Sequence, residues 1–200
     1  MAAKKAQVIT SKDVFKAAIA LCKGEENIRV AEYKDNLYVT EGHVLIRMDK
    51  QDVDQLLIAL KIVPQGIGRY CYYGKKWIYS EDTINIEKIL SEKMSSNTAE
   101  LTPYGYSNDT GVFRLAFAEG KIALFQEKFA KLIETVLDAC GGNLRSNGDS
   151  AFYVLGCKDA LELMVCGCHV SDETKGDLSG LASKITEGLR LMEEDKPKIM

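Results

Sequence analysis

The chain has 200 residues, of which 46% are hydrophobic and 28% charged, and its formal net charge is −3. This is the composition of an ordinary globular protein that can bury a sizeable core. The mild negative charge excludes a molecule that is basic as a whole, so any contact with nucleic acid would need a local basic patch.

The apolar runs are short. The longest, such as residues 56–60, cannot span a membrane, and the start MAAKKAQVITSKD lacks the apolar region of a secretory signal. Six cysteines are scattered over a chain long enough to fold without disulfides. We therefore predict a cytoplasmic protein with reduced thiols and no membrane partner.

The first half of the chain predicts a helix, three strands and an inserted region. A helix over residues 11–23 can be capped by Ser11, and its apolar residues recur at helical spacing. The further predicted elements are strands at 27–33, 36–42 and 43–48, a helix at 49–63 opened by a capping box of Asp49 and Asp52, a hairpin at 68–80, a helix at 82–96 and a loop at 95–111.

The second half predicts a second helix followed by strands. The predicted elements are strands at 112–117 and 121–125, a helix at 126–140 closed by Gly141 and Gly142, strands at 151–156 and 161–168, and an amphipathic C-terminal helix over 178–192. Because the strands are close neighbours joined by short turns, we predict an α+β fold with a mostly antiparallel sheet.

The sequence also predicts an internal repeat of a helix and three strands. The matched residues are Phe15, Ala18, Ile19 and Cys22 with Phe129, Leu132, Ile133 and Val136, then residues 37–39 with 152–154, and residues 45–48 with 161–164. We predict a single domain over 1–200 that holds the repeat at 8–48 and 112–168, with 49–111 as an inserted helix–hairpin–helix region. The alternative is chance, because helix faces and strands use few residue types.

This arrangement resembles the bacterial beta sliding clamp, and is closer still to short clamp-like proteins of phages and prophages. The resemblance covers Val8–Met48 and Val112–Cys168, roughly half of the chain, and includes no diagnostic motif. It implies a non-catalytic, DNA-associated processivity factor of phage or mobile-element origin. It also implies double-stranded DNA and replication proteins as partners, and a homo-oligomer, since a clamp ring needs six such domains.

The two repeated helices differ in charge, so one favours DNA binding and the other opposes it. On the first helix Lys12, Lys16 and Lys23 fall on one narrow stripe, as a phosphate-contacting face would require. The second helix carries an acidic stripe, which would repel phosphate; its members are Glu127, Lys131, Glu134 and Asp138.

The segment GRYCYYGKKWIYS at 68–80 has two interpretations. Its aromatic and basic side chains could bind nucleic acid, with Lys75, Lys76 and Trp77 as the contacts. Alternatively, aromatic residues paired across the strands hold a hairpin together, which is their commoner role in sheets. We expect a scaffold whose tip is a candidate contact.

No catalytic motif is present, and the densest set of chemically active side chains is Cys166, Cys168 and His169. These could hold a metal ion, but a strand would point the two cysteines to one face and the histidine to the other. Buried structural cysteines are the commoner outcome. A nucleophilic pair of Cys168 with His43 would lack an orienting third group.

We therefore predict no enzyme activity and no cofactor or metal. Two alternatives to the DNA-associated clamp remain open. One is a protein–protein adaptor that uses the C-terminal helix within Leu178–Met200, and the other is a small thiol- or metal-dependent enzyme.

Overall fold

The computed structural model describes residues 11–93, 97–108, 111–118, 121–146, 151–156 and 161–167. The helices are α1 (Ser11–Cys22), α2 (Lys50–Ala59), α3 (Ile86–Lys93) and α4 (Glu127–Cys140). The strands are β1 (Asn27–Tyr33), β2 (Asn36–Thr40), β3 (Val44–Met48), β4 (Gly68–Tyr73), β5 (Lys76–Ser80), β6 (Asn97–Asn108), β7 (Gly111–Ala118), β8 (Lys121–Gln126), β9 (Asn143–Ser146), β10 (Ala151–Leu155) and β11 (Leu161–Cys166).

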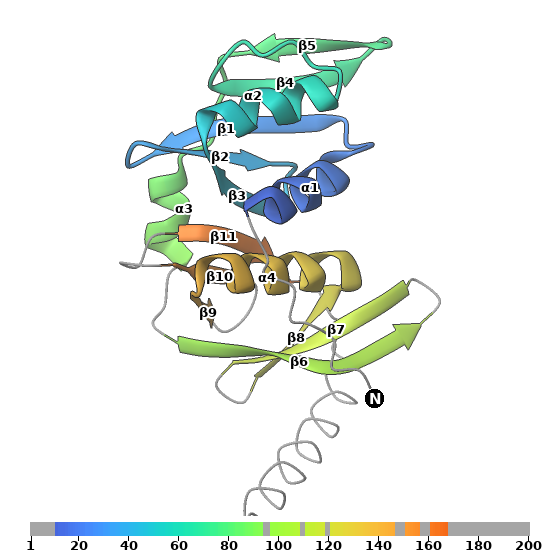
Figure 1. Ribbon diagram of the computed structural model, residues 1–200, viewed down its shortest axis with the longest axis vertical. Coiled ribbons are helices and arrows are strands. Elements are labelled where there is room, and N and C mark those ends of the chain that lie inside the picture. Colours follow the sequence, from blue (N-terminus) through green and yellow to red (C-terminus); the bar gives the residue numbers. More distant parts are fainter. Residues whose placement is uncertain are drawn as a thin grey trace, which may run out of the picture.

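The described strands form one antiparallel sheet of eleven strands (Figure 1). Its order is β5-β4-β1-β2-β3-β11-β10-β9-β6-β7-β8. The predicted α+β class with a mostly antiparallel sheet is therefore confirmed. The elements α1-β1-β2-β3 and α4-β9-β10-β11 follow one another in the same order, and they meet where β3 pairs with β11, with Leu45 opposite Met164.

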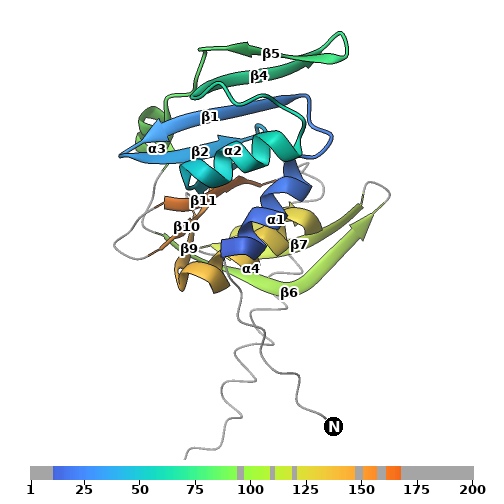
Figure 2. The same cartoon turned by 45° about the horizontal axis from the view of Figure 1, so that its top comes forward.

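Helices α1, α2 and α4 cover one face of the sheet, and α1 lies against α4 (Figure 2). Their apolar stripes meet the strand residues that point to this face, so the main core contains Ala18 and Leu21 of α1, Ile133 of α4, and Ile46 and Leu163 of the sheet. α4 ends at Gly141, whose φ of 60° and N–H donated to the carbonyl of Leu137 (2.9 Å) are typical of a glycine C-cap.

The opposite face carries a smaller core beneath α3. Tyr38, Leu45, Tyr153 and Met164 lie on this face and pack with Ile86 of α3. The Tyr38 hydroxyl donates a hydrogen bond of 3.1 Å to the carbonyl of Leu161, which links β2 to β11. Helix α3 therefore covers the junction between the two halves of the sheet.

The predicted loop over 95–111 is wrong. Residues 97–108 form β6, which pairs with β7 on one side and with β9 on the other. The polar composition and Pro103 suggested a loop, but the pairing with β7 shifts register between Leu101 and Gly105. Such an irregularity lets a strand hold a proline, which cannot donate to the ladder.

The predicted capping box at the start of α2 is also wrong. Asp49 occupies the cap position, but its side chain makes no capping hydrogen bond. α2 ends at Ala59 rather than near Val63, since Lys61 has a positive φ of 62°. The predicted C-terminal helix lies outside the described residues.

Candidate binding sites

Two lysines of α1 and the lysine that directly follows this helix are exposed. Lys12, Lys16 and Lys23 are all exposed, whereas Ala18 and Leu21 on the other side of α1 are buried. The Lys16 ammonium lies 3.6 Å from the carboxylate of Asp13 in the same helix, an exposed pair that leaves its charge largely available to a ligand.

The acidic stripe of α4 is partly neutralised by a residue of β7. Arg114 donates a hydrogen bond to Glu134 and lies 3.8 Å from Glu127, which also pairs with Lys131 at 3.7 Å. Sequence analysis did not assign Arg114 any role, although its charge interrupts the apolar run of β7. The expected repulsion of phosphate by α4 is therefore weaker than the sequence indicated.

The hairpin β4–β5 separates the candidate contacts at its tip. Lys75 and Lys76 are exposed, but Trp77 is partly buried and packs against the main core. Its ring contacts that of Tyr72 in a tilted arrangement, with the centroids 5.4 Å apart. Trp77 thus supports the hairpin. Figure 1 places this hairpin at the edge of the sheet and α1 over its middle, so the six candidate residues do not form one patch.

Of the candidate metal ligands Cys166, Cys168 and His169, the structure describes only the first. Cys166 is a partly buried cysteine at the end of β11, and Cys168 and His169 lie outside the described part of the chain. Within that part, no group of three or more His, Cys, Asp or Glu side chains could hold a metal ion. Nor does any described helix combine the length and apolarity needed to cross a membrane.

His43 belongs to a small polar group at the turn between β2 and β3. Its ring stacks on Phe129 at 6.2 Å, and its Nδ1 lies 3.8 Å from the carboxylate of Glu41. Glu41 is buried and accepts the backbone N–H groups of His43 and Val44. Burial, together with the Glu41 charge, raises the pKa of the nearby Cys22 thiol to about 12, so this cysteine is no nucleophile at neutral pH.

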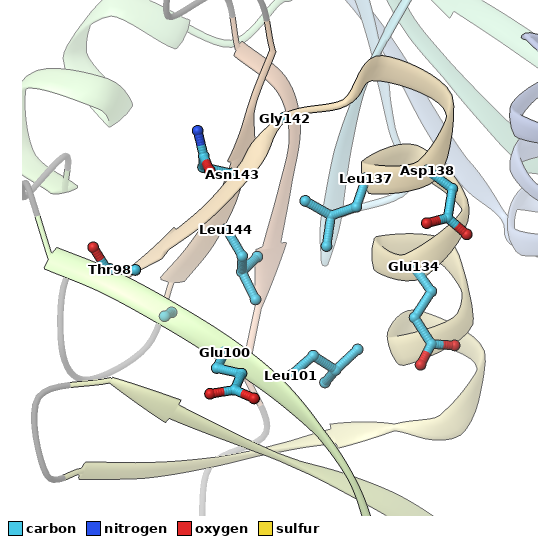
Figure 3. Close-up of a pocket in the computed structure, with 10 residues that line it drawn as sticks. Thr98, Glu100, Leu101, Glu134, Leu137, Asp138, Gly142, Asn143 and Leu144 are labelled. Atoms are coloured by element: carbon cyan, nitrogen blue, oxygen red, sulfur yellow. The ribbon is translucent and has the colours of Figure 1, made fainter. Parts of the chain in front are cut away.

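A pocket with an apolar floor and an acidic rim lies between α4 and the strands β6 and β9. Its volume is about 570 Å³. Figure 3 shows Leu101, Leu137 and Leu144 side by side on its floor, with the carboxylates of Glu134 and Asp138 on the helix and that of Glu100 on β6. Sequence analysis missed this pocket because it treated residues 95–111 as a loop.

A second, smaller cavity of about 240 Å³ lies on the other face of the sheet, next to α3. Its polar side is formed by Asn27, Arg29 and Thr40, at the end of the sheet where β1 begins and β2 ends. Its apolar side includes Leu45 of β3 and Met164 of β11. None of these residues was a predicted site residue, since alternating positions in a strand look alike whether they face solvent or a cavity.

Comparison with protein-family models, curated proteins and solved structures found no match to this chain.

Proposed function

We propose that the protein is a non-catalytic binding protein of clamp-like architecture, in which α1 contacts duplex DNA. The observation that carries this proposal is a set of three exposed lysines, Lys12 and Lys16 in α1 and Lys23 directly after it. This helix belongs to one of two similarly ordered units. Contact through one helix suits a chain whose total charge is negative.

The junction between β3 and β11 supports a duplication. Ile46 lies opposite Leu163, and the next pair along is bridged by an ion pair of 2.9 Å between Arg47 and Glu162. At an offset of 116 residues, Ile46 corresponds to Glu162 and Arg47 corresponds to Leu163. The two pairs are therefore equivalent, as a two-fold relation between repeated units requires. The starts of β1 and β9, residues 27–29 and 143–145, also match at this spacing, with the sequences NIR and NLR.

The ends of the sheet support self-association. Within the described residues β5 and β8 are the edge strands, and each pairs with one neighbour only. Pairing of β5 in one molecule with β8 in the next would run head to tail, which gives rings or filaments. This supports the homo-oligomer that a clamp role needs.

The proposal is tested by the binding of a short labelled duplex at several salt concentrations, with the mass in solution measured by light scattering. With three phosphate contacts, log K should fall against log salt with a slope of about −3. The triple variant Lys12/Lys16/Lys23→Gln should abolish binding. A matched triple of exposed lysines outside the candidate sites, Lys34/Lys61/Lys88→Gln, changes the net charge equally and should bind as the wild type does. Equal losses in both triples, or no binding at low salt, would contradict the proposal.

A protein–protein adaptor is the second candidate, and the pocket in Figure 3 is the observation that favours it. Its apolar floor and acidic rim suit a basic peptide segment that carries an apolar side chain. The same experiment separates the two candidates. A monomer indifferent to DNA would favour the adaptor, and DNA binding that depends on α1 would count against it.

A further inference from the structure

Arg29 is an arginine whose charge is not matched within the described part of the chain. Its Nε is buried and has no hydrogen-bond partner, and its guanidinium forms no ion pair there. Buried polar groups of folded proteins are nearly always paired, and an unpaired guanidinium N–H is costly because it has left water without gaining an acceptor. Such a group indicates a missing acceptor.

Space for that acceptor lies beside Arg29. The cavity next to α3 has a volume of about 240 Å³, the bulk volume of about eight water molecules. Thr40 is opposite Arg29 in the sheet, Leu45 is opposite Thr40, and Met164 is opposite Leu45. These four side chains therefore form one row on the same face, polar at the Arg29 end and apolar at the Met164 end.

The α3 side of the cavity is apolar as well, since Ile84 and Ile89 line it. A ligand in this space would meet Arg29 at the polar end and aliphatic or thioether surface at the other end. The polar end is also lined by Asn27, Thr40, Glu41 and His43. This is the usual composition of a small-molecule pocket, in which a few polar groups orient a mostly apolar body.

Of the two arginines near this end of the cavity, Arg29 is the one that can bind a ligand. Arg69 is directly opposite on β4, but its Nε donates to Asn27 at 3.0 Å and its guanidinium lies 3.9 Å from Asp82. Glu41 also lines the cavity, and its carboxylate already accepts two backbone N–H groups. Of the charged side chains that line the cavity, Arg29 is therefore the cation without an acceptor in the described part of the chain, while Glu41 keeps its negative charge.

We propose that this cavity binds a small ligand in which an oxyanion, a carboxylate or a phosphate, is attached to an apolar body, and that Arg29 binds the oxyanion. The planar guanidinium can donate two parallel hydrogen bonds to either group. The Thr40 hydroxyl, which accepts the N–H of Gly42 at 3.0 Å, retains its proton for a further bond to the same ligand.

The first test observes the Nε–H resonance of Arg29 in wild-type protein by NMR, assigned with the Arg29→Lys variant. The probes are phenyl phosphate and benzoate, with phenol as the neutral control of the same ring size. We expect a saturable shift with at least one anionic probe and none with phenol, and the stronger probe identifies the oxyanion. An Arg29 resonance that neither anion moves, or that phenol moves equally, would overturn the proposal.

A second test measures the affinity of the stronger probe for variants by calorimetry. Arg29→Gln should weaken binding about tenfold or more, since a hydrogen bond to a charged group is lost. Lys50→Gln removes an equal charge from the exposed start of α2 and should bind as the wild type does. Unchanged affinity in Arg29→Gln would refute the assignment; should that variant not fold, the wild-type resonance decides.

Discussion

Cys22 shows how strongly a single residue can depend on its surroundings. It ends α1, is 3% exposed and lies near the Glu41 carboxylate. Burial disfavours the thiolate, and the negative charge of Glu41 disfavours it further, so the pKa rises from 9.0 to about 12. The thiol remains protonated over a wide pH range in the folded protein.

This raised pKa predicts a loss of stability in alkali. The contribution is fully present below the unfolded pKa of 9.0 and is lost as the pH rises towards about 12, because only the unfolded chain then releases the proton. Urea unfolding from pH 8 to 11 should show the free energy of unfolding falling more steeply in wild type than in Cys22→Ala. Tyr38, whose pKa burial also raises to about 12, contributes equally to both proteins. Parallel curves would contradict the prediction.

Hairpin β4–β5 is the element whose two interpretations the structure separates most clearly. Gly74 and Lys75 have φ values of 57° and 65°, as a two-residue turn with left-handed positions requires. The ring of Tyr70 contacts that of Tyr79 in a tilted arrangement, with the centroids 5.2 Å apart, and the Tyr70 hydroxyl donates to the carbonyl of Gly66 at 2.8 Å. Together with Trp77 these rings fix the hairpin on the core.

Truncation of the aromatic side chain should therefore cost more than removal of the tip charges. Trp77→Ala should lower the free energy of unfolding by about 2–4 kcal/mol, because it removes packing against the core and Tyr72. Lys75→Ala and Lys76→Ala should each change it by less than about 0.5 kcal/mol. Denaturant titrations followed by circular dichroism measure both. A Trp77→Ala protein as stable as the wild type would show that the ring is no scaffold.

Elements with a strong periodic pattern could be predicted from the sequence. The strand β6, the pocket and the cavity could not, because they depend on segments that meet only in the folded chain. The buried stripe of α4 and the alternation in β1 depend on local chemistry, so their positions followed from the residues. β6 was missed because a strand containing Pro103 is stable only beside a partner such as β7. The pocket and the cavity join segments distant in sequence, and Arg29 gains its significance from that assembly.

At the scale of the molecule, the pairing of β3 with β11 makes one sheet from two halves. Leu163 is fully buried there, and Arg47 bridges to Glu162 across the same junction. The main core beneath α1 and α4 runs across it without a break. The halves should accordingly unfold together.

A substitution at this junction tests that cooperativity. Leu163→Ala should lower the free energy of unfolding by about 2–5 kcal/mol through the cavity it leaves. Trp77 is the sole tryptophan and lies in the first half, whereas β9 and β10 belong to the second. Tryptophan fluorescence and hydrogen exchange in β9 and β10 should therefore report one unfolding transition, in the wild type and in the variant. Two separated transitions would contradict the prediction.

The same junction has a consequence for synthesis on the ribosome. β3 emerges early, whereas its partner β11 is made only after the helices α2 to α4 and the strands β4 to β10. Because the ribosome adds about 5–20 residues per second, the edge of β3 stays without its partner strand for roughly ten seconds. During that interval the nascent chain presents a row of unpaired backbone groups beside apolar side chains, so its yield in cells should depend on chaperone capacity more than the stability of the finished fold would suggest.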